Sequence, residues 1–269
     1  MKKRGMMTMI LLTAALLCGC TIGKKTGSVP LMDFQAEMEW KSPSPAAGEK
    51  PRILFVGNSH TYYNNLSSMF VNIVNASGHR SSVQELSSGY YTLKQFADES
   101  DQGGALLDKT LKDRSWDFVI LQEHTTNSLS AAAPEEMYPP SRILDQKIKD
   151  SGGQTAFLMT WTPKKGIKNQ KPAQVQSDIA SSYMTIAEEL DSLVIPAGIS
   201  FMRCLETYPD IELWDKDGQH PSPEGSYLAA CTVYAVIFQE SPENCSYTGD
   251  LDKELAQKLQ NIAAETVLN

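Results

Sequence analysis

Short apolar runs alternate along this chain with stretches whose apolar residues recur at helical spacing. This alternation constrains the fold most, because strands separated by helices favour a parallel sheet with helices on both faces. We therefore expect an α/β protein with a five-stranded parallel sheet. The expected strands are 52–56 (RILFV), 82–86, 116–122 (WDFVILQ), 155–161 (TAFLMTW) and 193–196.

Helical faces fill the intervals between these runs. Leu66, Met69, Phe70, Ile73 and Val74 fall on one side of a helix, because they are spaced three or four residues apart. Further helices are expected around 106–111 and 143–148, and over 173–191, 197–207, 223–238 and 250–267. A length of 269 residues with 41% hydrophobic and 21% charged residues suits one large globular domain.

The first twenty residues have the pattern of a targeting segment. A basic start (Lys2-Lys3-Arg4) precedes a short apolar run that is too short to span a membrane. Leu17-Cys18-Gly19-Cys20 resembles a bacterial lipobox, and an ordinary signal peptide is the alternative. We expect a signal peptide over 1–19, a lipidated Cys20 with a flexible tether over 20–50, and a domain over 51–269.

Either kind of signal takes the protein out of the cytoplasm, and the lipobox predicts a membrane-anchored lipoprotein at the cell surface or in the periplasm. The formal net charge of -8 argues against nucleic acid as a partner. An exported protein could pair two of the cysteines Cys204, Cys231 and Cys245, and their spacing does not say which two. No Cys-x-x-Cys occurs, so metal binding by cysteine is not expected.

Ser59 follows directly on the first expected strand, in Gly57-Asn58-Ser59-His60. Gly57 permits a sharp turn there, and the N-terminus of the following helix offers free N–H groups to an oxyanion. Ser59 is thus a candidate nucleophile. The alternative is an ordinary helix cap, a position that both serine and asparagine favour.

Asp217 and His220 are the candidate partners, in Asp217-Gly218-Gln219-His220-Pro221. A carboxylate on one imidazole nitrogen fixes the tautomer and frees the other nitrogen as a base. The alternative is a capped loop with a surface histidine. Gly89 and Gln122 also lie at expected strand ends, and a backbone N–H and an amide are the donor types that stabilise an oxyanion. A turn glycine and a strand-end polar residue are the plainer interpretations.

Taken together, these segments resemble the SGNH/GDSL hydrolases, a superfamily named for Ser, Gly, Asn and His in four sequence blocks. The resemblance spans roughly residues 51–239. It implies a flavodoxin-like three-layer α/β/α sandwich with Ser59 as nucleophile, His220 as base and Asp217 as its orienter. It also implies an oxyanion hole formed by Ser59, Gly89 and Gln122.

The third block departs from the family pattern of Gly-x-Asn-Asp. Here the strand ends in Leu121-Gln122-Glu123-His124, so the expected asparagine is replaced by Gln122. Gln122 keeps the amide and adds a methylene. Asn127, five residues further on, is a rival for the same role.

Other polar and aromatic residues lie near the expected strand ends. His60, His124 and His220 lack paired metal-ligand spacing, so neither a metal nor another cofactor is expected. Lysines follow the fourth strand in a loop interpreted as solvated surface, although it could flank the site. Aromatic residues near the strand ends could stack on a sugar or pack the rim, and both interpretations stay open. The lysines are Lys164, Lys165, Lys168 and Lys171, and the aromatic residues are Tyr62, Tyr63, Tyr90, Tyr91 and Trp161.

The resemblance and the compartment imply a serine esterase that removes acetyl or other short acyl groups from carbohydrate outside the cytoplasm. The chain has no long apolar lid region, which argues mildly against a long-chain lipase. One alternative is a non-catalytic or weakly catalytic glycan-binding lipoprotein, suggested by the altered third block. Another is an O-acyltransferase, which would use the same residues.

Overall fold

The computed structural model describes residues 31–269, and the predictions on residues 1–30 fall outside these described residues. Its centre is a sheet of five parallel strands in the order β2-β1-β3-β4-β5. The predicted α/β class and five-stranded parallel sheet are confirmed. The strands are β1 (Arg52–Gly57), β2 (Ser82–Ser87), β3 (Phe118–Leu121), β4 (Gln154–Leu158) and β5 (Leu193–Ile195).

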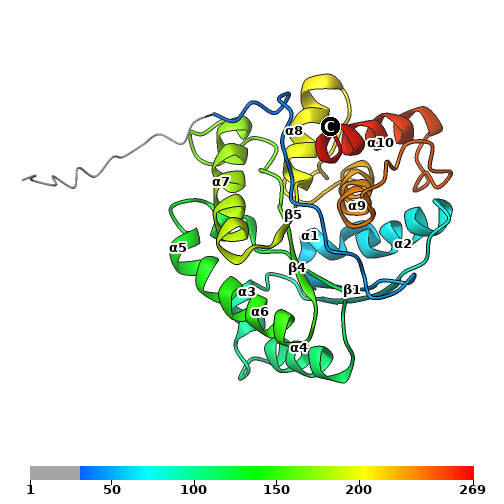
Figure 1. Cartoon of the computed structure of the whole chain (residues 1–269). Helices are drawn as coiled ribbons and strands as arrows, with labels where there is room; N and C mark the ends of the chain where they lie inside the picture. Colours follow the sequence, from blue (N-terminus) through cyan, green and yellow to red (C-terminus); the bar gives the residue numbers. More distant parts are fainter. Residues whose placement is uncertain (1–30) are drawn as a thin grey trace, which may run out of the picture.

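Helices cover both faces of this sheet (Figure 1). One face is covered by α2 (Leu66–Ala76), α9 (Pro223–Phe238) and α10 (Lys253–Val267). The other is covered by α3 (Leu93–Ala97), α4 (Gln102–Asp113), α6 (Tyr138–Asp150) and α7 (Pro172–Leu190). The remaining helical segments are α1 (Ser59–Tyr62), η1 (Tyr63–Asn65), η2 (Thr125–Ser128), α5 (Ala133–Glu136) and α8 (Ala197–Thr207).

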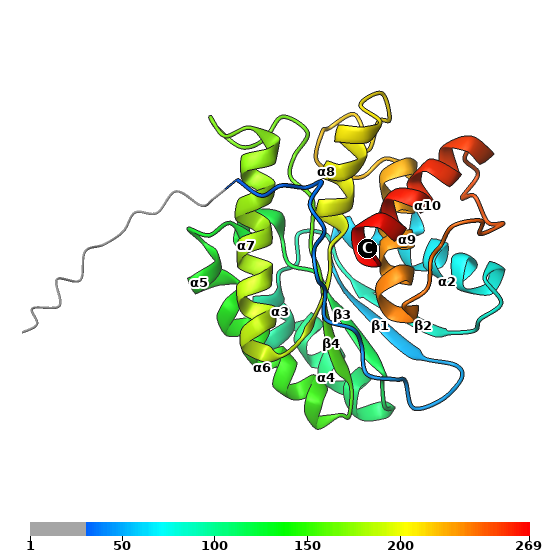
Figure 2. The same ribbon diagram turned by 45° about the horizontal axis from the view of Figure 1, so that its top comes forward.

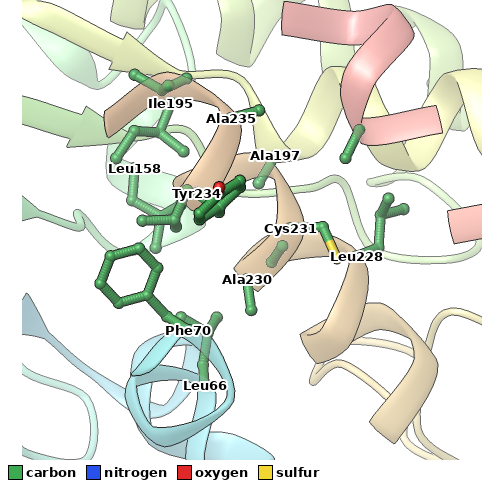
Figure 3. Close-up of a cluster of buried hydrophobic side chains, with 14 of the residues drawn as sticks. Leu66, Phe70, Leu158, Ile195, Ala197, Leu228, Ala230, Cys231, Tyr234 and Ala235 are labelled. Carbon is green, nitrogen blue, oxygen red and sulfur yellow. The ribbon is translucent and has the colours of Figure 1, made fainter. Parts of the chain in front are cut away.

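Strand β1 shows why the sequence forms a doubly covered sheet. Ile53 and Phe55 lie in one hydrophobic core, and Leu54 and Val56 lie in the other, as the two-residue period of a strand requires. Figure 3 shows part of the first core, where side chains of α2 and α9 pack against those of β4 and β5. A strand buried on both faces needs a continuous apolar run, which RILFV supplies.

The strand order fixes where a site can form. The chain passes from β1 outward to β2, then returns past β1 to β3 and continues to β4 and β5. The direction of winding therefore reverses between β1 and β3. Parallel sheets bind ligands at the carboxyl ends of the strands beside such a reversal. Ser59 follows β1 and Gln122 follows β3, so both lie at this point.

Residues 31–50 lie against the domain, so the prediction of a flexible tether over 20–50 is wrong for this part (Figure 2). Phe34 is 2% exposed, and the indole N–H of Trp40 donates a 2.7 Å hydrogen bond to the carbonyl of Thr266. The short apolar interruption in this polar segment is the part that packs, because burying apolar surface is favourable. The folded domain thus includes residues before position 51.

The three cysteines of residues 31–269 are free thiols, and those of Cys204 and Cys231 are buried. Over the same residues, no helix is both long enough and apolar enough to cross a lipid bilayer.

Candidate active site

Ser59, His220 and Asp217 form a continuous hydrogen-bonded series at the carboxyl end of the sheet. The Nε2 atom of His220 lies 2.8 Å from Oγ of Ser59, and its Nδ1 atom lies 2.5 Å from a carboxylate oxygen of Asp217. Ser59 and His220 are both half-buried, whereas Asp217 is exposed. The structure thus brings together the three residues that the sequence predicted as nucleophile, base and orienter.

The histidine is held by a tight loop between α8 and α9. Backbone hydrogen bonds pair the arms of this loop, from Asp215 N to His220 O at 2.8 Å and from Ser222 N to Leu213 O at 3.0 Å. Gly218 turns the chain with a φ of 69°, a conformation that costs glycine little. The spacing of three residues therefore places the carboxylate of Asp217 beside the imidazole of His220.

Asp217 is held in its ionised form. Partial burial opposes ionisation, but hydrogen bonds from the His220 side chain and from the backbone N–H groups of Gln219 and His220 outweigh it. Together they lower the pKa of Asp217 to about 2. A carboxylate at Nδ1 favours the tautomer in which Nε2 faces the Ser59 hydroxyl as an acceptor.

Asn58 links the Ser59 turn to the neighbouring loop. Its side-chain oxygen caps α1 by accepting from His60 N at 3.2 Å, and its Nδ2 donates to the carbonyl of Tyr91 at 2.9 Å. An aspartate at this position would have no hydrogen to donate to Tyr91. The asparagine therefore ties the Ser59 turn to the loop that carries Gly89.

The structure does not place the amide of Gln122 in an oxyanion hole, because both ends of this amide are hydrogen-bonded to residues of the Ser59 turn and of the segment after β3. The oxygen of Gln122 accepts from Asn58 N at 2.8 Å and from the Thr61 hydroxyl at 2.9 Å. Its Nε2 donates to the carbonyl of Glu123 at 2.7 Å, and the side chain is 1% exposed. The buried amide of Gln122 therefore holds the Ser59 turn in place and is not exposed to a substrate.

Replacing Gln122 with alanine is therefore expected to cost roughly 2–4 kcal/mol of unfolding free energy. The change leaves the Asn58 N–H and the Thr61 hydroxyl buried without an acceptor and opens a cavity. Urea unfolding would measure the loss, with the exposed Gln146→Ala as a matched control. An unchanged unfolding free energy together with a large loss of kcat would contradict this role and restore the oxyanion assignment.

Two backbone N–H groups remain as candidate oxyanion donors. Neither the N–H of Ser59 nor that of Gly89 donates a hydrogen bond to any group of residues 31–269. Gly89 is exposed in the loop after β2. Asn127 is half-buried and donates one amide hydrogen to Glu123 at 3.4 Å. Its other amide hydrogen is uncommitted, so its role as the third donor stays a prediction.

Glu123, next to Gln122, is a fully buried carboxyl group that no pattern in the sequence singles out. It accepts from Leu93 N at 3.2 Å, from His124 N at 2.5 Å and from Asn127 Nδ2 at 3.4 Å. Burial outweighs these hydrogen bonds and raises the pKa of Glu123 to about 8. The group thus joins the start of α3 to the turn η2 as a neutral acid.

This buried acid makes the stability of the fold depend on pH. The unfolded chain releases the Glu123 proton near pH 4.5, whereas the folded protein keeps it up to about pH 8. Unfolding free energy should therefore fall as pH rises through this window, by roughly 3–5 kcal/mol relative to the neutral variant Glu123→Gln. Urea unfolding of both proteins at several pH values checks the slope, and parallel curves would contradict it. The exposed Glu135→Gln is the control.

His60 lies beside the site as a neutral ring. Burial first, and then the neighbouring imidazole of His220, lowers the pKa of His60 to about 3. Its ring centroid lies 5.2 Å from that of Trp161 and 5.5 Å from that of His220. His124 is half-buried, and burial lowers the pKa of its ring as well. Within residues 31–269, no cluster of three histidine, cysteine or acidic side chains is arranged to hold a metal ion.

Tyr63 and Asn64 hold His220, the candidate base, and its loop in place, a role that the sequence did not reveal. The Tyr63 ring stacks on the imidazole of His220 with centroids 4.1 Å apart and planes 10° apart. Asn64 donates through Nδ2 to the carbonyl of Pro221 at 2.9 Å and adopts a left-handed φ of 54°. The pair Asn64-Asn65 is the one available signal, because asparagine tolerates this conformation better than most residues.

The lysine-bearing loop after β4 does flank the His220 loop. Lys164 and Lys165 line a cavity of about 420 Å³, and Lys164 forms an ion pair with Glu212. Three lysines and three acidic residues line this cavity, so the charges balance and no basic cradle for an anion forms. The lining residues of these kinds are Lys164, Lys165, Lys216, Glu212, Asp215 and Asp217.

No protein-family model and no curated protein match the chain. Among solved structures, it is similar to a protein from Slackia heliotrinireducens provisionally assigned to the SGNH hydrolases. That likeness has 25% identity and a TM-score of 0.61, and it covers 70% of this chain and 98% of that protein.

Two further solved structures share the fold at lower identity. A DUF4886 family protein from Bacteroides uniformis is 15% identical with a TM-score of 0.68, covering 80% of this chain and 93% of that one. An acetylxylan esterase from Geobacillus stearothermophilus is 16% identical with a TM-score of 0.52, covering 71% and 95%.

The fold and the hydrogen-bonded series of Ser59, His220 and Asp217 define an SGNH-type serine hydrolase. The chain belongs to the SGNH/GDSL hydrolase superfamily.

Proposed function

We propose that this protein is a serine esterase that acts through Ser59, His220 and Asp217. The observation that carries the proposal is the 2.8 Å contact between Nε2 of His220 and the Ser59 hydroxyl, with Asp217 on the opposite nitrogen. A serine is a weak nucleophile unless an adjacent base removes its proton as it attacks. This arrangement supplies the base and holds it in the required tautomer.

The reaction follows from these positions. Oγ of Ser59 attacks the ester carbonyl while His220 takes the Ser59 proton, and the backbone N–H groups of Ser59 and Gly89 stabilise the oxyanion. His220 returns the proton to the leaving alcohol, which leaves an acyl group on Ser59. Water then attacks the acyl-enzyme with His220 as base, which releases the acid and restores the serine.

The proposed substrate is an acetyl or other short acyl ester on carbohydrate. A solved structure of the same fold is that of an acetylxylan esterase, and the expected export of the chain would bring it to extracytoplasmic glycans. Asp217 and Gly89 are both exposed, so the site is open to solvent on their side. An open site suits an ester with a bulky alcohol portion.

Hydrolysis of p-nitrophenyl acetate, butyrate and octanoate tests the activity and the acyl length. We expect the highest kcat/KM for acetate, with a steep decline toward octanoate. A preference for octanoate would contradict the short-acyl substrate. Background rates with all three esters, and with acetylated xylan, would contradict the esterase and favour the glycan-binding alternative.

We also propose that the enzyme works outside the cytoplasm, anchored to a bacterial membrane through Cys20. The basic start, the apolar run and the lipobox-like Leu17-Cys18-Gly19-Cys20 support this location. Met32 N donates to the hydroxyl of Ser177 at 2.8 Å, in the early part of α7, which follows the carboxyl end of β4. An anchor at Cys20 would thus join the domain on its active-site end. Metabolic labelling with palmitate, abolished by Cys20→Ala, tests the proposal, and unlabelled wild-type protein would contradict it.

A further inference from the structure

The structure separates the five aromatic residues near the strand ends into two groups. Tyr63 stacks on His220, the hydroxyl of Tyr91 donates to Asp101 at 2.9 Å, and Trp161 is buried. These three side chains are therefore already engaged in contacts within the protein. Tyr62 and Tyr90 have no comparable packing role.

Tyr62 and Tyr90 are the only exposed aromatic residues within residues 31–269, at 37% and 86%. Both lie next to groups of the proposed reaction. Tyr62 belongs to α1, the short helix that begins at Ser59, and Tyr90 directly follows Gly89. Exposed aromatic rings are thus confined to the surroundings of the candidate nucleophile.

The two exposed rings are carried by segments that touch. A Cβ atom built on Gly89 would lie 3.5 Å from the hydroxyl of Tyr62, so the outer end of Tyr62 faces the loop that bears Tyr90. The Tyr62 and Tyr63 ring centroids are 5.8 Å apart, and Tyr63 in turn stacks on His220. Aromatic rings therefore continue outward from the base toward solvent.

Tyr90 has a backbone conformation that is unusual for an exposed tyrosine. Its φ of 63° lies in the left-handed region, where a bulky side chain is disfavoured and glycine or asparagine is common. With 86% of its surface exposed, the ring recovers little of this cost by burial. Strained residues of this kind concentrate at functional sites. Packing of the free protein does not explain a tyrosine here, whereas contact with a ligand would.

We propose that Tyr62 and Tyr90 form a stacking platform that binds the sugar ring of the ester substrate, an inference that rests on the proposed esterase function. A tyrosine offers an apolar face to the C–H groups of a sugar ring and a hydroxyl to the sugar's polar edge. An acyl chain would need an enclosed apolar groove, which rings exposed by 37% and 86% do not form. The platform therefore selects the alcohol portion of the ester.

Kinetics with two acetyl esters test the platform. The substrates are O-acetylated xylotriose and p-nitrophenyl acetate, and the readout is the ratio of their kcat/KM values. Tyr90→Asn removes the ring and tolerates the left-handed backbone, so it should lower this ratio about 3- to 10-fold through a higher KM for the sugar ester. Tyr90→Phe keeps the ring and loses only the hydroxyl, so it should lower the ratio less than Tyr90→Asn does. The exposed Met184→Asn on α7 is the control for loss of surface apolar area. An unchanged ratio in Tyr90→Asn would overturn the proposal.

Binding without turnover separates this inference from the esterase itself. Titration calorimetry would use Ser59→Ala protein with unacetylated xylotriose, cellotriose and chitotriose. We expect at least one trisaccharide to bind, and its affinity to fall about 3- to 10-fold when Tyr90→Asn is added. If the wild-type protein hydrolyses no ester, this titration still decides the platform. Lack of binding by all three sugars, or equal binding with and without the Tyr90 ring, would overturn it.

Discussion

Replacing Ser59 with alanine is expected to lower kcat for p-nitrophenyl acetate by roughly 10⁴- to 10⁶-fold, toward the rate left by binding and oxyanion stabilisation alone. The reason is that the hydroxyl 2.8 Å from Nε2 of His220 is the only group in this series that can form the acyl-enzyme. KM should change far less than kcat, because the lost interaction belongs to the reaction and not to substrate binding.

An exposed serine elsewhere provides the control for the loss of the Ser59 hydroxyl. Ser68 is exposed on α2, and Ser68→Ala should leave kcat unchanged. Steady-state kinetics of both variants, with thermal unfolding to confirm that each is folded, make the comparison. A Ser59→Ala protein that is folded and retains a tenth of the wild-type kcat would contradict the role of Ser59.

Replacing Asp217 with asparagine is the second large effect, with an expected loss of roughly 10⁴-fold in kcat. An amide can donate to Nδ1, which would turn the imidazole to the tautomer whose Nε2–H faces Ser59 and cannot take its proton. The loss should persist across the neutral pH range, because the pKa of Asp217 is about 2 and the wild-type carboxylate stays ionised there.

Asp215 provides the control for this loop. Its carboxylate is exposed and accepts from Lys216 N at 2.8 Å, two residues before Asp217. Asp215→Asn should keep kcat, since it removes a similar charge without touching His220. Equal losses in both variants would mean that the loop's charge or folding matters, and not the contact between Asp217 and Nδ1.

The elements with clear end signals could be predicted from the sequence. Helices were expected at 197–207 and 223–238, and α8 and α9 have these bounds. Ser222 caps α9 by accepting from Gly225 N at 3.0 Å, and Pro223 occupies its first position, as the sequence pattern for a helix start requires. Long periodic segments and their caps are local properties, so the sequence alone contains them.

Other elements depend on tertiary contacts that no local pattern contains. Helix α3 has 5 residues and α5 has 4, too short for a helical period to appear, and neither was predicted. Strand β4 was expected to continue to Trp161 but ends at Leu158. The apolar run extends beyond the end of the strand because Trp161 is buried against Phe201, with ring centroids 4.4 Å apart.

Some residues of the candidate site could likewise be predicted from the sequence, and others could not. Ser59, Asp217 and His220 could be predicted because their residue types and their places at segment ends limit what they can do. Gln122 could not, because the direction of its amide is set by Asn58 and Thr61, more than sixty positions earlier in the chain. The burial of Glu123 also depends on the assembled fold and not on its neighbours in sequence.

Labelling with a fluorophosphonate is the most direct test of Ser59 as the nucleophile, because this reagent bonds covalently to a serine activated by an adjacent base. We expect a single adduct in the intact mass of the wild-type protein, located on Ser59 by peptide mapping. We also expect no adduct in Ser59→Ala and a strongly slowed reaction in Asp217→Asn. An unmodified wild-type protein, or an adduct on another residue, would contradict the assignment of Ser59 as the nucleophile.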